Sequence, residues 1–153
     1  MQHKPLKRHK ALQTLSRDHH HGLLLSWKIR SGLSKNIAPQ RIGVYVHWFF
    51  ETHLLPHFEL EEQHIFPILS PNNELIKIAL EDHSRLKHLF TEIDKDAHTL
   101  SNIEEGLERH IRFEERMLFP EIQKAATEEQ LMQIEKIHQQ DSFEDKLDDE
   151  FWK

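Results

Sequence analysis

The chain of 153 residues contains no cysteine and has few glycines and valines. Without cysteine it can form no disulfide framework, thiolate nucleophile, zinc ribbon or sulfur-ligated iron cluster. Any bound metal must therefore be held by nitrogen and oxygen. Only 4 glycines and 2 valines stand against 20 leucines, which is too little glycine and valine for a sandwich or barrel. The composition predicts an all-α fold.

The sequence also lacks long apolar runs and an excess of positive charge. No run approaches the ~18 residues of a membrane span, and the basic start is not followed by the apolar core of a signal peptide. We therefore expect a soluble, cytoplasmic protein with no membrane partner. With 20 Lys and Arg against 26 Asp and Glu, the net charge is -6. This balance argues against a nucleic-acid partner, because phosphate binding needs a broad cationic surface.

Histidine is the residue that is unusually abundant, with 14 copies. A purification tag does not explain them, because His19, His20 and His21 lie inside an amphipathic segment and the others are scattered. The histidines are therefore candidates for chemistry.

Helical periodicity separated by short breakers predicts an antiparallel up-down four-helix bundle over residues 1–126. A short C-terminal helix and an acidic tail follow in 127–153, and the helix opens at a predicted capping box of Thr127 and Gln130. The four bundle helices are predicted at Lys10–Gly32, Pro39–Leu69, Glu74–Thr99, and from Ser101 or Asn102 to Ala126.

An eleven-residue segment is repeated in the second and fourth predicted helices. His57 to Pro67 is echoed by His110 to Pro120, with His, Glu, Glu, Phe and Pro at identical offsets. The repeat predicts two helix pairs related by an approximate two-fold axis, with a paired site at their shared centre.

Each repeat carries a pair of metal-ligand residues four positions apart. Residues at this spacing lie on one face of a helix, so His57 and Glu61 can chelate one cation, and so can His110 and Glu114. A solvated glutamate on a charged helix is the ordinary alternative for any single position. Duplication of the whole pattern favours metal ligands.

The other two helices each add one histidine. His83 lies at the centre of the apolar stripe of the third helix, which is formed by Ile76, Ala79, Leu86, Phe90 and Ile93. In the first helix, His19 lies in the middle of the apolar arc, and His20 on its flank is the alternative ligand. The predicted metal ligands are therefore His19, His57, Glu61, His83, His110 and Glu114.

One ion cannot use six such ligands, so the set predicts two. Four imidazoles, two bridging carboxylates and a bridging oxygen fill about ten of about twelve octahedral positions, which leaves about two for a small ligand. Imidazole with carboxylate suits iron, manganese or zinc, and a bridged octahedral pair favours iron.

These motifs resemble the hemerythrin-like family, also called the HHE cation-binding domain, over about residues 12–125. The resemblance is carried by Asp18-His19-His20, by His83 and by the two repeated HxxxE segments with their Glu-Glu and Phe-Pro continuations. It implies an up-down four-helix bundle around two non-haem iron ions, oxo- or hydroxo-bridged, with Glu61 and Glu114 as bridges. It also implies small ligands such as dioxygen, peroxide or nitric oxide.

Lys87 stands where oxygen-carrying members have a second histidine, and the last motif ends in glutamate at a spacing of four. This pattern is closer to the sensory and iron-sulfur-repair members, although the cysteine-bearing domain of repair proteins is absent. The main hypothesis is thus a di-iron protein that binds or senses a small oxidant. The alternatives are a di-iron oxidoreductase or repair-type enzyme handling nitric oxide or peroxide, with Tyr45 or Trp48 as possible proton donors, and a metal-free, pH-responsive helical protein.

Three further features leave alternatives open. Glu61 and His64 form the ExxH pattern of ferritin-like sites, but Met117 replaces the second histidine in the repeat. His53 is either a hydrogen-bond partner of the ligands or a core histidine. Pro56 is expected to kink the second helix.

Apolar residues recur every four positions in the acidic tail, at Phe143, Leu147 and Phe151. If helical, this stripe could dock on the bundle or on a protein partner, and the alternative is a disordered acidic terminus. A tail docked in cis could cover an opening into the site, so truncation after Gln140 is expected to speed ligand access.

Overall fold

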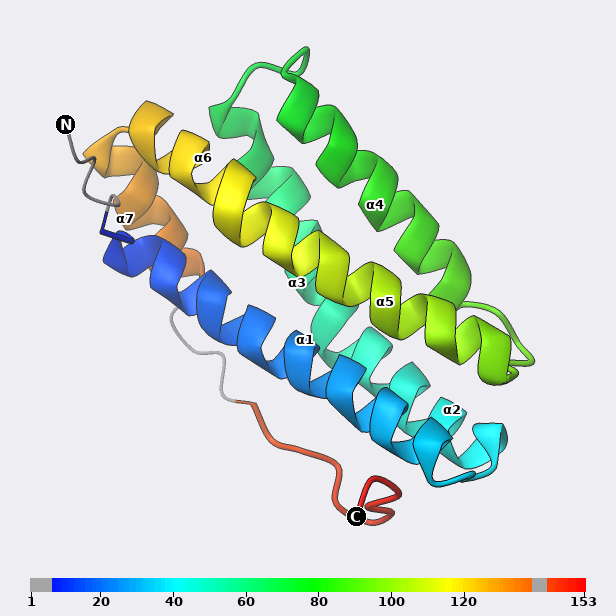
Figure 1. Cartoon of the computed structure of the whole chain (residues 1–153). Helices are drawn as coiled ribbons and strands as arrows, with labels where there is room; N and C mark the ends of the chain where they lie inside the picture. The colour runs from blue at the N-terminus through cyan, green and yellow to red at the C-terminus, as the bar shows by residue number, and fades with distance from the viewer. Residues whose placement is uncertain (1–6, 139–142) are drawn as a thin grey trace, which may run out of the picture.

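The computed structural model describes residues 7–138 and 143–153, and within these ranges all regular secondary structure is helical (Figure 1). The predicted all-α class is confirmed. None of the helices in the described ranges is long and apolar enough to cross a membrane. The α-helices are α1 (Lys10–Ser34), α2 (Pro39–Phe49), α3 (Leu55–Leu60), α4 (Glu74–Phe90), α5 (Ala97–Phe113), α6 (Phe119–Ala125) and α7 (Glu128–Ile137).

Wide π-helical turns join α2 to α3, follow α3, and join α5 to α6. Each one ends two residues before a proline. The residue before the proline donates its N–H to the carbonyl five residues back, in the pairs Leu55 to Phe50, Phe66 to Glu61 and Phe119 to Glu114. Proline has no N–H, and its ring clashes with the carbonyl four residues earlier in a regular helix, so a wider turn relieves the clash. The predicted irregularity at Pro56 is therefore a widened turn, and the helical path continues through it.

Two apolar clusters form the core, and a layer of buried histidine and glutamate side chains lies between them. Along α1, Leu15 of one cluster precedes this layer and Leu25 of the other follows it. Along α5 and α6 the order is reversed, because Leu107 belongs to the second cluster and Leu118 to the first. Since α1 packs beside α5, these neighbours run in opposite directions (Figure 1). The same reversal holds for α2 with α3 relative to α4.

The predicted boundary between the third and fourth helices is wrong. A loop over residues 91–96 separates α4 from α5, whereas helix was predicted through Thr99. The Asp96 side chain accepts a hydrogen bond from the Thr99 N–H, so Asp96 caps α5 in place of Ser101 or Asn102. Because an N-cap carboxylate satisfies a backbone donor that the helix leaves free, it fixes where the helix begins.

Two residues that were predicted on apolar stripes are exposed instead. Ile93 is 96% exposed because it lies in the loop after α4, and Leu147 is 60% exposed. No helix forms within residues 143–153, so a spacing of four no longer places Leu147 on the same side as Phe143 and Phe151.

The C-terminal helix α7 begins at the predicted capping box, which is confirmed. Thr127 accepts a hydrogen bond from the Gln130 N–H, and the Gln130 side chain accepts one from the Thr127 N–H. Leu131 and Ile134 are buried in the same apolar cluster as the start of α1. Thus α7 shares its core with the long helices.

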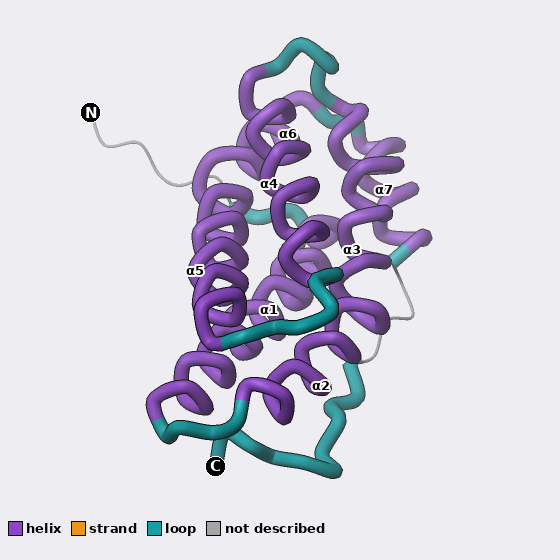
Figure 2. Tube along the Cα trace, turned by 90° about the vertical axis from the view of Figure 1, so that its right-hand side faces the viewer, coloured by secondary structure: helices purple, strands orange, loops and turns teal. Residues whose placement is uncertain are grey.

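The tail packs in cis against α1 and α2 (Figure 2). Phe151 and Trp152 are buried in the apolar cluster there, and the Trp152 carbonyl accepts hydrogen bonds from Ser31 and Lys35. The truncation point Gln140 lies outside the described residues. A protein partner reached through the tail stays a prediction.

Candidate metal centre

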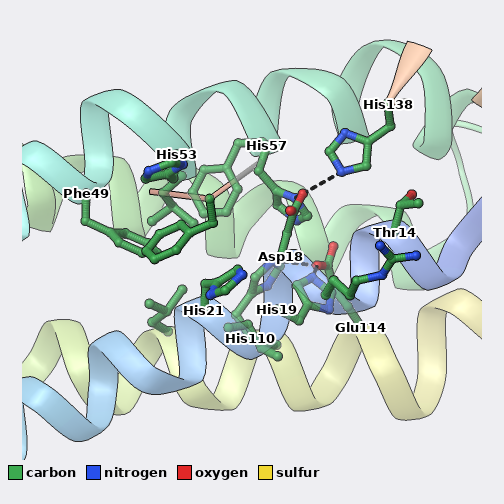
Figure 3. A pocket seen from close by; sticks show the side chains of 17 residues that line it. Thr14, Asp18, His19, His21, Phe49, His53, His57, His110, Glu114 and His138 are labelled. Carbon is green, nitrogen blue, oxygen red and sulfur yellow. Dashed lines mark hydrogen bonds and ion pairs between the residues drawn. The ribbon is translucent and has the colours of Figure 1, made fainter. Parts of the chain in front are cut away.

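The six predicted ligands converge between the helices, and all are buried. Glu61 and Glu114 have no exposed surface, and no histidine among the six is more than 6% exposed. Figure 3 shows His19, His57, His110 and Glu114 close to one another between the helices that carry them. The set comes from α1 (His19), α3 and the turn after it (His57, Glu61), α4 (His83), and α5 with its following turn (His110, Glu114).

These side chains form two groups that share both carboxylates. One group is His19, His57, Glu61 and Glu114, and the other is Glu61, His83, His110 and Glu114. Within each group the ligand atoms lie within 4.8 Å of one another. Each group could hold one metal ion, and the two positions would be joined by Glu61 and Glu114.

The short distances run from imidazole Nε2 atoms to the two carboxylates. Glu61 Oε1 lies 3.4 Å from His57 Nε2 and 3.2 Å from His83 Nε2. Glu114 Oε1 lies 2.9 Å from His19 Nε2 and 3.4 Å from His110 Nε2. The pattern around Glu61 is therefore repeated around Glu114, as the sequence repeat predicts.

Several of these buried atoms have no hydrogen-bond partner among the described residues. They are Nε2 of His57, His83 and His110, both carboxylate oxygens of Glu61, and Oε2 of Glu114. A buried polar atom without a partner is costly, and native proteins rarely leave one unsatisfied. Nitrogen and oxygen lone pairs that face a common point are satisfied by a cation, so this donor set fits a metal ion.

A second carboxylate contacts the other nitrogen of each histidine. In each case the Nδ1–H donates to a carboxylate oxygen, and the distances are 2.8 Å (His19 to Glu115), 3.0 Å (His57 to Asp18), 2.7 Å (His83 to Glu62) and 3.0 Å (His110 to Asp82). A proton on Nδ1 leaves the Nε2 lone pair directed at the centre. Such partners fix the tautomer and ring orientation of metal-binding histidines.

These four outer carboxylates were not assigned a role from the sequence. Two of them directly precede His19 and His83, and two directly follow Glu61 and Glu114. The signal was available, because an Asp-His pair recurs in α1 and α4 just as the Glu-Glu pair recurs after the two HxxxE motifs. Each outer carboxylate holds a histidine on a different helix, so together they tie the helices around the centre.

Neighbouring carboxylates raise the pKa of the central histidines. Burial by itself lowers the pKa of His57, but the charges of Glu61 and Asp18 outweigh burial and raise it well above the ordinary value. Burial is likewise outweighed at His110, where Glu114 and Asp82 raise the pKa to about 10. Without metal, protons therefore occupy the centre, and cations must displace them to bind.

Phenylalanine rings cover the histidines and exclude water. Phe119 of the second repeat stacks on His19 at 5.2 Å, and Phe66 of the first packs on His83 at 5.3 Å between ring centroids. Phe58 stacks on His83 at 3.8 Å. The recurring Phe-Pro pair thus supplies both the wide turn and an apolar cover.

The structure also resolves the alternatives that were left open at single histidines. His20 is exposed, so His19 is the residue of α1 that reaches the centre. His64 is exposed as well, which removes it from a ferritin-like ligand set. His53 is half-buried and packs against Trp48 and Phe49, while Nδ1 of His57 bonds to Asp18.

A cavity of about 140 Å³ reaches one side of the centre (Figure 3). His19, His57, His110 and Glu114 line it, and Glu61 and His83 do not. The other lining residues include imidazoles and a carboxylate (His21, His53, His138, Asp18) and the apolar side chains of Phe49, Leu54, Phe58, Leu107, Ile111 and Phe143. The lining of the cavity therefore includes both polar and apolar side chains. The cavity has room for a small molecule beside the centre.

Neither aromatic residue that was considered as a proton donor lines this cavity. Tyr45 donates its hydroxyl hydrogen to Asp145 and accepts from Lys28, and Trp48 packs against His53 and Phe143 without being part of the lining.

Comparison of the chain with protein families, with curated proteins and with solved structures finds no match. Function is therefore inferred from the residues and geometry of the centre.

Proposed function

We propose that the chain is a hemerythrin-like protein whose non-haem di-iron centre binds or senses a small oxidant such as dioxygen, peroxide or nitric oxide. The observation that supports this best is the pair of buried ligand groups that share Glu61 and Glu114. The alternating directions of the long helices agree with the antiparallel up-down four-helix bundle that the sequence predicts.

The ligand types favour two iron ions. Each position takes two imidazoles and a share of two carboxylates, with no sulfur, which suits iron and leaves coordination positions for a small ligand. His19 and His57 would hold one ion and His83 and His110 the other. When bound, the metal pair would supply reversible one-electron and two-electron redox chemistry.

The chain's own side chains would set the conditions for that chemistry. The outer carboxylates keep each imidazole in the tautomer that presents Nε2. Phe58, Phe66 and Phe119 keep water away from the histidines. The cavity beside His19 and His57 gives a small ligand room to approach.

Metal analysis of the purified protein tests the proposal directly. We expect close to two irons per chain and near-ultraviolet absorption that azide or nitric oxide changes. One zinc per chain without such absorption would refute the di-iron assignment. A metal-free protein that does not take up Fe(II) anaerobically would instead support the pH-responsive alternative.

The second candidate is a di-iron oxidoreductase or iron-sulfur-repair-type enzyme that handles nitric oxide or peroxide. It is favoured by the imidazoles of His21, His53 and His138 in the cavity lining, because reduction of such ligands needs protons. An enzyme should consume peroxide or nitric oxide catalytically in the presence of a reductant, whereas a sensor should bind once without turnover.

A further inference from the structure

Phe143, the first described residue of the tail, forms part of the wall of the cavity. Its ring stacks on His21 with 4.0 Å between centroids and 11° between planes. His53 lies 4.5 Å away on another side, and Phe49 lies 6.1 Å away. The Phe143 side chain therefore lies between a residue of α1 and residues of the helical segment that runs from α2 to α3 and carries His57.

The tail that carries Phe143 is held by a buried charge. Lys28 is only 7% exposed. Its ammonium donates to Asp145 at 2.6 Å and to the Tyr45 hydroxyl at 2.8 Å, and it lies 4.0 Å from the centre of the Trp152 ring. Tyr45 also donates to Asp145, at 2.5 Å.

The Lys28–Asp145 ion pair is more buried than the ion pair that Asp149 of the tail forms with Arg41. Asp149 pairs with Arg41 at 2.7 Å, and both side chains are about half exposed. Water screens such a pair, so it contributes little to stability, whereas a buried lysine that loses its partner is costly. Asp145, two residues after Phe143, is therefore the ion-pair anchor of the tail that lies nearest the ring in sequence and is the better buried of the two.

On the side of His83, the centre is covered by side chains that are packed more firmly than Phe143. Phe58 and Phe66 lie on the imidazole, and both belong to the buried core. Phe143 is only half-buried and comes from a segment without regular secondary structure. Among the residues that line the cavity, it is the one whose displacement disturbs the helices least.

We propose that Phe143 determines ligand access to the metal centre and the size of ligand admitted, and that the Lys28–Asp145 pair controls how often the ring moves aside. The proposal rests on the proposed function for the identity of the ligand, which is a small oxidant or an anion of similar size. Ligands as small as azide would enter when the ring moves briefly, and a larger ligand such as imidazole would need it displaced.

Stopped-flow binding of azide and of imidazole to the metal-loaded full chain tests this. Removal of an aromatic stack in Phe143→Ala should raise the azide association rate about two- to tenfold, with a larger gain for imidazole. Asp145→Asn keeps the ring and weakens the anchor, so it should raise both rates as well. Leu147→Ala and Asp149→Asn are matched controls in the same tail, and both should behave as the unaltered chain.

A second readout needs no metal. Diethyl pyrocarbonate acylates accessible imidazoles, and peptide mass mapping gives its rate at His21, which Phe143 covers. That rate should rise in Phe143→Ala and Asp145→Asn and stay unchanged in Leu147→Ala. If the chain binds no metal, the proposed function fails, while this rate still decides whether Phe143 controls access.

Two results would overturn the proposal. Equal azide, imidazole and acylation rates in Phe143→Ala and Leu147→Ala would show that ligands enter elsewhere. A loss of metal content in Phe143→Ala with unchanged rates in Asp145→Asn would show that the ring supports the site and does not control entry.

Discussion

Removing the charge of one outer carboxylate should weaken metal binding without changing any ligand. His110 donates its Nδ1–H to Asp82 at 3.0 Å. In Asp82→Asn the amide oxygen can still accept this hydrogen bond, so the ring orientation survives while the negative charge is lost. Changes in such partners cost about 10- to 100-fold in metal affinity, or about 1.4–2.7 kcal/mol.

The effect should lie toward the lower end of that range. The Asp82 side chain is 15% exposed and also contacts Arg85 at 3.0 Å, so its charge is already partly compensated. Asp18, which holds His57 in the matching position, is shared instead with the largely buried His138 at 2.8 Å. Because the Asp18 side chain is 26% exposed and its charge is also shared, Asp18→Asn should lower affinity by a similar factor.

Anaerobic Fe(II) titration against a chromogenic chelator measures the change. Asp94→Asn removes the same charge from an exposed position in the loop after α4 and serves as the control. If Asp82→Asn and Asp94→Asn bind iron equally well, the outer carboxylates do not tune the histidines, and the argument from the Nδ1 hydrogen bonds is wrong.

Three further outcomes are expected. Because His19 is buried and His20 exposed, His19→Ala should lower the iron content by inductively coupled plasma analysis far more than His20→Ala, and the reverse order would mean that α1 is rotated. His57→Ala should abolish the rise in melting temperature that added iron gives the unaltered chain, a stabilisation of about 4 kcal/mol at a thousandfold excess over Kd; an unchanged rise would exclude His57 as a ligand. In the metal-free protein, the raised pKa of His110 stabilises the fold fully below the ordinary value of 6.5, and this contribution is lost as the pH rises toward about 10. Urea unfolding of the metal-free chain should thus show a free energy of unfolding that falls between pH 7 and 10, and one that rises would contradict the assigned charges.

The local features of this protein follow from short-range pattern. The HxxxE spacing places His57 over Glu61 and His110 over Glu114 because the helix repeat does so wherever the helix lies. Prolines after Leu55, Phe66 and Phe119 dictate wide turns for a reason that is equally local, the missing N–H and the clash with the preceding turn. Helical class, the two HxxxE pairs and the α7 capping box are all of this kind.

Features that depend on how the helices pack could not be predicted from short-range sequence patterns. Which of His19 and His20 faces the centre depends on a rotation of α1 that its neighbours set. The bond from Asp18 to His57 joins residues 39 positions apart, and no spacing rule reaches that far. The start of α5 at Ala97 was missed because Asp96, which caps it, lies in a segment where the helical pattern of the sequence continues.

In the tail, the difference between what the sequence predicts and what packing decides is clearest. Its composition identifies apolar residues able to dock, but the spacing of four suggests a helix that does not form in residues 143–153. Its path depends on Lys28 and Tyr45, which lie 117 and 100 positions before Asp145. Sequence periodicity shows which residues share one side of a helix or strand, but it does not show where that element packs. The position of Phe143 beside the centre is set by contacts between elements, and only the packed structure contains them.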